Sequence, residues 1–178
     1  MIFQKQQIDG VFLMEAQLYR DGRGLFRRHY CENELKENGI EFSAKQGNIS
    51  ENNKKFTLRG FHYQKATSKE SKIISCISGT IYNVIIDLRK DSSTFLKWQA
   101  FNLSLSGRES LYIPVGCANT FLTLEDDARI HYYMNDFFST ESLGFRYNDP
   151  FFNIPWPYEP VIISERDKDF PDFSLEDL

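Results

Sequence analysis

One histidine, His62, has the residue type and the setting of a proton-transferring group. It lies in the segment FTLRGFHYQ (residues 56–64), where Phe, Thr, Leu and Tyr favour a strand. A free imidazole has a pKa of about 6.5 and can therefore take a proton at neutral pH. Side chains alternate along a strand, so Gly60 and Gln64 share the face of His62, and Arg59 lies at its edge. Two interpretations stay open here: a buried histidine satisfied by a backbone carbonyl, or the base of an active site.

Metal and dinucleotide sites do not fit the spacing of these residues. A metal site needs two or more clustered histidine or carboxylate ligands, whereas GFHYQ offers one histidine and the pattern HxH is absent. The glycine-rich fingerprint GxGxxG is absent as well. We therefore expect no metal and no bound cofactor.

Three further side chains could take part in proton transfer, although each has an ordinary alternative. Lys72 begins an apolar strand after a lysine-rich loop, and a solvated lysine is common at such a place. Tyr132 and Tyr133 must point to opposite faces of a strand, so one phenol faces inward, where core packing is the usual role. Asp167, in SERDKDF, has the setting of a surface acid. None of these residues identifies a site by itself.

The composition argues against several classes of function. The net charge is −4 and the pI is about 5.4, which does not suit a nucleic-acid binder with a basic face. Cys31, Cys76 and Cys117 are far apart and odd in number, so neither a disulfide framework nor a zinc site is expected. The N-terminus lacks a secretory pattern, and no segment has the roughly 20 apolar residues of a membrane helix. We expect a soluble, cytoplasmic protein without nucleic-acid or membrane partners.

The elements that would position the candidate residues are mostly short strands. Aromatic residues make up 15% of the chain, including 16 Phe and 9 Tyr, which favours a β fold. Gly, Pro, Ser or Asp bound most of the apolar segments, as expected for strands joined by turns. The expected strands are 72–79, 80–89, 98–104, 109–116, 120–125 and 128–134, and an extended segment at 10–19 precedes a turn at 20–24.

The rest of the chain predicts little helix. A helix is expected at 31–40, a polar loop at 47–55, and an irregular Pro-rich segment at 147–170 that wraps the surface. This pattern predicts one all-β domain over residues 1–178, a sandwich or jelly roll. The space between the sheets of such a fold can hold a ligand, because alternate side chains point into it.

Six ordered blocks of the sequence resemble the dTDP-4-dehydrorhamnose 3,5-epimerase family over nearly the whole chain. LRGFHYQ (58–64) is similar to the family's most distinctive block, Leu–Arg–Gly–Leu–His–aromatic–Gln. The other blocks are RDGRGLF (20–26), SKIISCISGTIYNVIIDLRKDSSTF (71–95), LYIPVGCANTFLTL (111–124), YNDPFFNIPWP (147–157) and ISERD (163–167). Members of the family are cupin-type jelly rolls without a metal, usually homodimers. They invert C5, or C3 and C5, of a nucleotide-linked 4-keto-6-deoxy sugar.

The resemblance implies a role for each of the candidate residues. By position, His62 looks like the general base, Asp167 like the carboxylate that orients it, and Tyr132 like the acid on the opposite face. Lys72 and Arg59 resemble the cations that hold the C4 oxygen. These types suit the chemistry, because a proton next to a ketone leaves only when charge spreads onto the carbonyl oxygen. A preplaced cation stabilises that charge.

The resemblance also implies contacts to the nucleotide diphosphate. Arg23 and Phe26 match family positions that contact phosphate and base, although a surface arginine in a turn is the alternative for Arg23. Gln46 and Asn48, in KQGNIS, match polar contacts to phosphate or sugar. The expected partners are therefore a nucleotide diphosphate 4-keto-6-deoxy sugar and a second copy of the chain.

Four positions depart from the family pattern. Asn119 replaces a histidine near the reacting sugar, and an amide hydrogen-bonds but takes up no proton. Whether C3, C5 or both are inverted therefore depends on this position. Arg28 stands where a glutamate is usual, near the expected nucleotide site, so the base preference can differ from thymidine. Asn83 stands where Asp is common, and Tyr147 replaces the usual Trp.

The function that follows from these residues is epimerisation through proton abstraction and an enolate, in the biosynthesis of deoxysugars or surface polysaccharides. Two alternatives remain on the same fold. One is a 3,4-ketoisomerase, which would move the carbonyl instead of inverting a centre. The other is a cupin that binds a nucleotide sugar without turnover.

Overall fold

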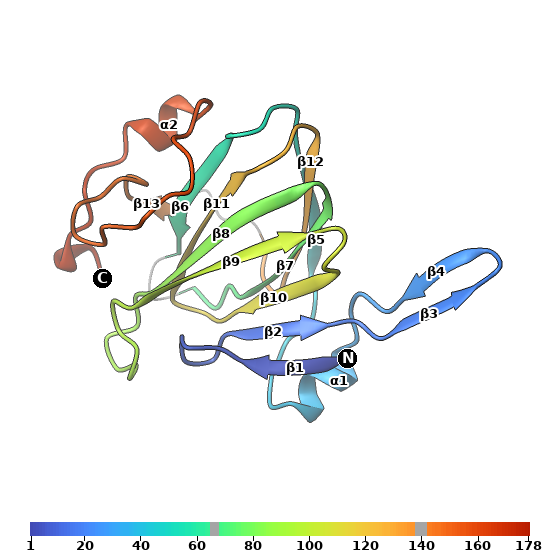
Figure 1. The fold of residues 1–178 in the computed structure, drawn as a ribbon. Coiled ribbons are helices and arrows are strands. Elements are labelled where there is room, and N and C mark those ends of the chain that lie inside the picture. The colour runs from blue at the N-terminus through green and yellow to red at the C-terminus, as the bar shows by residue number, and fades with distance from the viewer. Residues whose placement is uncertain (65–67, 138–141) are drawn as a thin grey trace.

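The computed structural model describes residues 1–64, 68–137 and 142–178. Within these ranges the chain forms two antiparallel sheets, which face each other, and a separate hairpin (Figure 1). The six-stranded sheet has the order β1 (Ile2–Lys5), β2 (Phe12–Glu15), β10 (Glu109–Ile113), β7 (Lys72–Ser78), β12 (Ala128–Met134) and β5 (Gln46–Asn52). The five-stranded sheet has the order β13 (Leu143–Gly144), β6 (Leu58–Tyr63), β11 (Cys117–Thr123), β8 (Thr80–Asp87) and β9 (Trp98–Ser104).

The remaining elements lie at the edges of this sandwich. The hairpin of β3 (Leu18–Asp21) and β4 (Gly24–Arg27) extends away from the two sheets (Figure 1). The described residues include two short helices, α1 (Glu32–Glu37) and α2 (Glu165–Lys168), together with a 3-10 turn at Leu175–Asp177. None of the helices in the described ranges is long and apolar enough to cross a membrane.

The prediction of a polar loop at 47–55 was wrong for residues 47–52, which form a strand. They belong to β5, which pairs with β12 along its whole length. Gln46, Asn48 and Ser50 are half-buried while the residues between them are exposed, so the strand alternates without apolar residues on its inner face. Because the strand lines a polar pocket, the usual alternation of apolar and polar residues is missing from its sequence.

The space between the two sheets has an apolar end and a polar end. One end is filled by buried side chains from β7, β8, β9, β10 and β12, including Ile81, Leu103, Leu111 and Ile130. Further along β12, Tyr132 packs against this cluster and is only partly buried. The strands therefore change, along their own length, from closing the core to lining a pocket.

The C-terminal segment covers the outer face of the five-stranded sheet, as predicted for 147–170. Phe61 of β6 is fully buried and stacks on Phe145 at 4.7 Å, and Phe152 stacks on Phe145 at 5.3 Å. Backbone hydrogen bonds join Leu58 to Ile162 and continue the contact toward α2. This packing holds the end of the chain against β6, the strand that carries His62 (Figure 1).

Candidate active site

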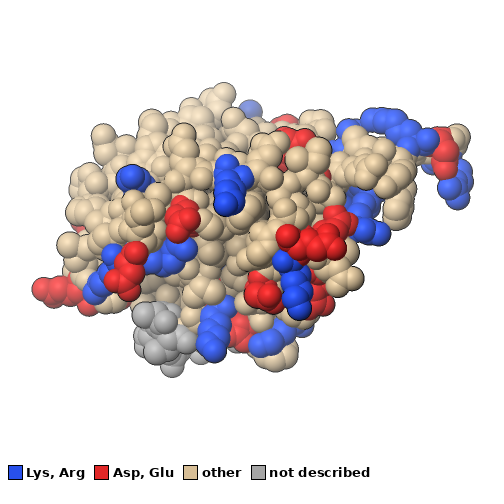
Figure 2. All heavy atoms as spheres, turned by 90° about the horizontal axis from the view of Figure 1, so that it is seen from below, with Lys and Arg blue, Asp and Glu red and all other residues tan. Residues whose placement is uncertain are grey.

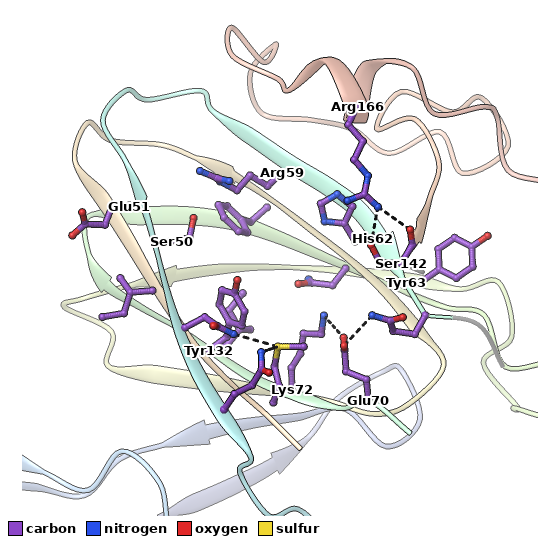
Figure 3. A pocket seen from close by; sticks show the side chains of 18 residues that line it. Ser50, Glu51, Arg59, His62, Tyr63, Glu70, Lys72, Tyr132, Ser142 and Arg166 are labelled. Atoms are coloured by element: carbon purple, nitrogen blue, oxygen red, sulfur yellow. Dashed lines mark hydrogen bonds and ion pairs between the residues drawn. The ribbon is translucent and has the colours of Figure 1, made fainter. Parts of the chain in front are cut away.

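A pocket of about 470 Å³ opens at the polar end of the sandwich (Figure 3). Side chains from both sheets and from the C-terminal segment line it. The predicted site residues that line the pocket are Gln46, Asn48, Arg59, His62, Lys72, Asn119 and Tyr132. The structure therefore brings together most of the residues that were predicted separately from distant segments.

His62 and Asp167 form a hydrogen-bonded pair at one wall of this pocket. The His62 Nε2 atom lies 2.8 Å from Asp167 Oδ1, and the His62 side chain is 37% exposed while that of Asp167 is 5% exposed. The carboxylate accepts the Nε2 proton, which leaves Nδ1 of the ring as the proton acceptor. This arrangement fixes the tautomer that a general base requires.

Asp167 is not the surface acid that its sequence setting suggested. It lies in α2, which Ser164 caps at its N-terminus and which packs on β6, and its second oxygen, Oδ2, accepts the Gly60 N–H at 3.0 Å. Burial alone would raise the pKa of Asp167, but the hydrogen bond and charge of His62 and the Gly60 N–H hold it below its ordinary value. The carboxylate is therefore charged at neutral pH and can support an imidazolium.

Gly60 permits the close approach that this pair requires. Its φ is +109°, and a Cβ built at this position would lie 2.7 Å from the backbone oxygen of Asn119 on the neighbouring strand. A side chain here would push β6 away from β11 and move the N–H that Asp167 accepts. Gly60 thus helps to place the carboxylate behind His62.

Tyr132 and Lys72 extend into the pocket from the six-stranded sheet, on the other side from His62 (Figure 3). Of the two neighbouring tyrosines, Tyr132 faces the pocket, and Tyr133 packs on the outer face of the sheet against His131 and Tyr30. Burial raises the pKa of the Tyr132 phenol, which therefore stays protonated and uncharged at neutral pH. It is in the state required of a proton donor.

The sequence reasoning missed three charged residues that line this pocket: Glu51 at its rim, Glu70 and Arg166. Glu70 is 8% exposed and pairs with Lys72 at 3.0 Å, and Arg166 of α2 lines the pocket beside Asp167 and donates to Ser142 at 2.8 Å. Glu70 and Lys72 are two residues apart, and in an extended segment this spacing places both side chains on the same side of the chain. No such spacing indicated Arg166, because the burial of its neighbour was not foreseen.

Polar side chains continue around the opening of the pocket. Arg59 Nε donates to Asn52 Oδ1 at 2.8 Å, which fixes the guanidinium near the edge of β6. Asn48 and Gln46 each lie 3.4 Å from the sulfur of Met134. Amide and guanidinium groups of this kind can donate to phosphate and sugar oxygens.

The two asparagines that depart from the family pattern contact each other. Asn119 donates from Nδ2 to Asn83 Oδ1 at 2.9 Å and to the Val84 carbonyl at 3.1 Å. In the described part of the chain, the Nδ2 of Asn83 has no hydrogen-bond partner although it is buried. The two changes therefore form one uncharged pair, in which no group titrates near neutral pH.

Arg23 and Phe26 do not reach the pocket of their own chain. Both lie on the β3–β4 hairpin, where Arg23 pairs with Asp21 at 2.7 Å and is 91% exposed, while Phe26 contacts Tyr19. Figure 2 shows Lys and Arg side chains gathered on this hairpin, at the right of the view. The hairpin residues and the pocket residues are thus separate within one chain (Figure 1).

The two other departures also lie outside the pocket. Arg28 follows the hairpin and pairs with Glu34 of α1 at 2.5 Å, so its charge has a local partner. Tyr147 lies in the C-terminal segment, and its hydroxyl donates to Glu159 at 3.3 Å. Across the described ranges of the chain, no three His, Cys, Asp or Glu side chains gather closely enough to hold a metal ion.

A sandwich whose open end pairs an imidazole with a buried carboxylate, and faces them with a phenol and an ammonium, has the groups that an isomerase needs to move a proton at a carbon next to a carbonyl. The chain belongs to the dTDP-4-dehydrorhamnose 3,5-epimerase family, whose sequence profile matches residues 5–174. The resemblance seen in the sequence is confirmed, and the protein is an isomerase of this family.

Known proteins of similar sequence and structure support this assignment. The dTDP-4-dehydrorhamnose 3,5-epimerase of Methanothermobacter thermautotrophicus is 36% identical over 172 residues, which cover 94% of this chain and 92% of the relative. The crystal structure of the Bacillus anthracis enzyme with TDP and PPi bound has a TM-score of 0.93 at 34% identity, and the match covers 97% of this chain and 99% of that chain.

A second solved structure holds a sugar nucleotide. It is the dTDP-6-deoxy-D-glucose-3,5-epimerase of Legionella pneumophila in complex with dTDP-4-keto-L-rhamnose, with a TM-score of 0.88 at 28% identity. The match covers 97% of this chain and 98% of that chain. The predicted fold class, an all-β cupin-type jelly roll with a short helix and an irregular C-terminal segment, is confirmed.

Proposed function

We propose that this protein epimerises a nucleotide diphosphate 4-keto-6-deoxy sugar at C5, at C3 or at both carbons. The observation that carries the proposal is the His62–Asp167 pair, which lies in a pocket opposite Tyr132 and Lys72. A pocket of about 470 Å³ is large enough for the sugar of such a substrate. The family and its ligand-bound members support the same substrate class.

The proposed reaction needs one base, one acid and a cation. His62 Nδ1 removes the proton from the carbon next to the C4 ketone, while Asp167 stabilises the imidazolium that forms. Charge moves onto the C4 oxygen, where Lys72 and Arg59 stabilise the enolate. Tyr132 then returns a proton from the opposite face, which inverts the carbon. The oxidation state of the sugar is unchanged at the end.

The asparagine pair supports an altered course for this reaction. The amide nitrogen of Asn119 donates to Asn83 and Val84, so its oxygen is the atom that can accept a hydrogen bond from the sugar, and the amide cannot serve as a second base. We infer that the number of inverted carbons depends on whether His62 alone can reach both positions. This distinguishes the chain from relatives that carry a histidine at this place.

Deuterium exchange tests the proposal directly. The protein is incubated in D2O with a panel of nucleotide 4-keto-6-deoxy sugars that differ in base and sugar, and exchange at C3 and C5 is followed by NMR. We expect exchange at C5, at C3 or at both with at least one member of the panel. Exchange at one carbon alone identifies a single-carbon epimerase, whereas a 3-keto product identifies a ketoisomerase. Binding without any exchange would sink the proposal.

We infer further that the protein is a homodimer in which each β3–β4 hairpin completes the pocket of the other copy. The support is the distance of Arg23 and Phe26 from their own pocket, together with their predicted contacts to the nucleotide. The hairpin also exposes Tyr19 and Phe26, at 54% and 70%, which a partner surface would cover.

We also infer that the protein works in the cytoplasm. Its three cysteines are free, and free thiols suit the reducing conditions of that compartment.

Mixed dimers test the inferred homodimer. We expect His62→Ala and Arg23→Ala to be inactive alone, and expect activity to return when the two proteins are unfolded and refolded together. Statistical pairing gives mixed dimers with one intact pocket in two, so about a quarter of wild-type exchange should return. The control is the double variant carrying both changes in one chain, which should restore nothing. No recovery in the mixture, with a mass near 20.9 kDa in solution, would contradict the shared pocket.

A further inference from the structure

Glu70 is a second buried carboxylate in the pocket, on the wall away from Asp167. Its two oxygens have different partners: Oε1 lies 3.0 Å from Lys72 Nζ, and Oε2 accepts from Gln64 Nε2 at 3.0 Å. The side chains of Glu70 and Lys72 are 5% and 21% exposed. The three residues therefore form a chain of contacts along the pocket wall, drawn in Figure 3.

The environment of Glu70 repeats that of Asp167. Each carboxylate uses one oxygen to hold a nitrogen group that faces the pocket, His62 in one case and Lys72 in the other. Each uses its second oxygen to accept an N–H group from the same segment of chain, the backbone of Gly60 or the side chain of Gln64. The segment around β6 thus fixes both carboxylates at once.

An ammonium in this position needs such a partner. Taking a charged amine out of water is costly, and a nearby carboxylate offsets that cost. An ammonium has three N–H donors, and Glu70 takes one of them, so the group keeps donors for an oxygen in the pocket. Because Gln64 holds the carboxylate from its other side, the direction of the remaining donors is fixed before a substrate arrives.

We propose that Glu70, held by Gln64, is a positioning residue that keeps the Lys72 ammonium in place and directed at the oxygen that gains charge in the reaction. The proposal rests on the proposed function for the identity of that oxygen, the C4 oxygen of the sugar. In this proposal, Glu70 supports Lys72, which binds the enolate, in the same way that Asp167 supports His62, which removes the proton. Glu70 itself does not touch the reacting atoms.

Glu70→Gln is the variant that tests this role. It keeps the length of the side chain and removes the charge. We expect kcat for deuterium exchange to fall by about 10- to 100-fold with KM changed by less than about threefold, because the interaction strengthens only as the enolate forms. Glu70→Asp keeps the charge on a shorter side chain, and its kcat should lie between those of the wild type and Glu70→Gln. The matched control is Glu159→Gln, which makes the same change at an exposed acid of the C-terminal segment that does not line the pocket.

A second measurement follows Lys72 without turnover. Reductive methylation of the free protein is followed by mass spectrometry on the peptide that contains Lys72. We expect faster labelling of this amine in Glu70→Gln than in the wild type, and no change in Glu159→Gln, because only the first removes its carboxylate partner. Thermal unfolding of each variant shows whether the fold is retained, and Glu70→Asp takes the place of Glu70→Gln if that variant does not fold.

The outcomes separate this proposal from the proposed function. A wild-type protein that exchanges, with a Glu70→Gln variant within twofold of it in kcat, overturns the positioning role. So does a rise in KM alone, which would make Glu70 a direct contact of the substrate. Absence of exchange in the wild type overturns the proposed function instead. In that case, the labelling of Lys72 still tests the positioning role, and equal labelling in Glu70→Gln and the wild type overturns that role as well.

Discussion

Replacing His62 by alanine is expected to lower the rate of deuterium exchange by about 1,000-fold or more, which corresponds to about 4 kcal/mol of transition-state stabilisation. The reason is that the ring is half-exposed in the pocket and is held by Asp167 in the tautomer that accepts a proton at Nδ1. No other histidine lines the pocket in the described ranges, since His29 and His131 lie together on the outer face of the six-stranded sheet.

The fold should survive this change. His62 is not part of an apolar core cluster, and Asp167 keeps the Gly60 N–H when the ring is removed. Exchange is measured by NMR in D2O, and folding by circular dichroism and thermal unfolding. His29→Gln is the matched control, because it removes a histidine that lies outside the pocket. Exchange within tenfold of the wild type in His62→Ala would mean that another group is the base.

Asp167→Asn should lower the exchange rate by about 100- to 10,000-fold while leaving the pocket in place. An amide that donates to the Nε2 side of the ring favours a proton on Nδ1, the atom that must accept one. The amide oxygen can still accept the Gly60 N–H, so the backbone contact of α2 with β6 is kept. The loss therefore falls on proton transfer and not on the position of the strand.

The pH dependence distinguishes this variant from a simple loss of packing. Because the pKa of Asp167 is lowered in the folded protein, its charge stabilises the fold above the unfolded pKa of about 3.9, and that contribution is lost as the pH falls through the lower folded pKa. Asp167→Asn should remove this acid-side change in thermal stability. Asp169→Asn, two residues on and exposed, is the control. Equal exchange in both variants would exclude Asp167 as the partner of the base.

Much of the fold and of the pocket follows from local patterns in the sequence. The strands on either side of Gly79 are rich in β-branched residues, and β7 and β8 were predicted close to their observed bounds. His62 was recognised by its block, LRGFHYQ, and the alternation along that strand placed Gln64 in the same pocket. These predictions needed no knowledge of distant contacts.

The remaining features depend on contacts between segments far apart in the chain. Asp167 lies among charged residues, so nothing local indicated that α2 would bury it against β6. The strand β5 was taken as a loop because its inner face is polar where it borders the pocket. The hairpin residues were matched by position, but a single chain's sequence does not say which copy's pocket they meet. The roles of the site residues stay predictions until the variants are measured.

The C-terminal segment has one more consequence, for how the His62–Asp167 pair depends on the fold. The two residues are 105 positions apart in the sequence, and they meet because the aromatic segment around Phe145 and Phe152 packs on the outer face of β6. Cleavage of the chain between β12 and α2 is expected to leave most strands of both sheets in place and to remove the carboxylate behind the imidazole. The integrity of this segment is thus coupled to proton transfer more directly than to the pairing of the strands.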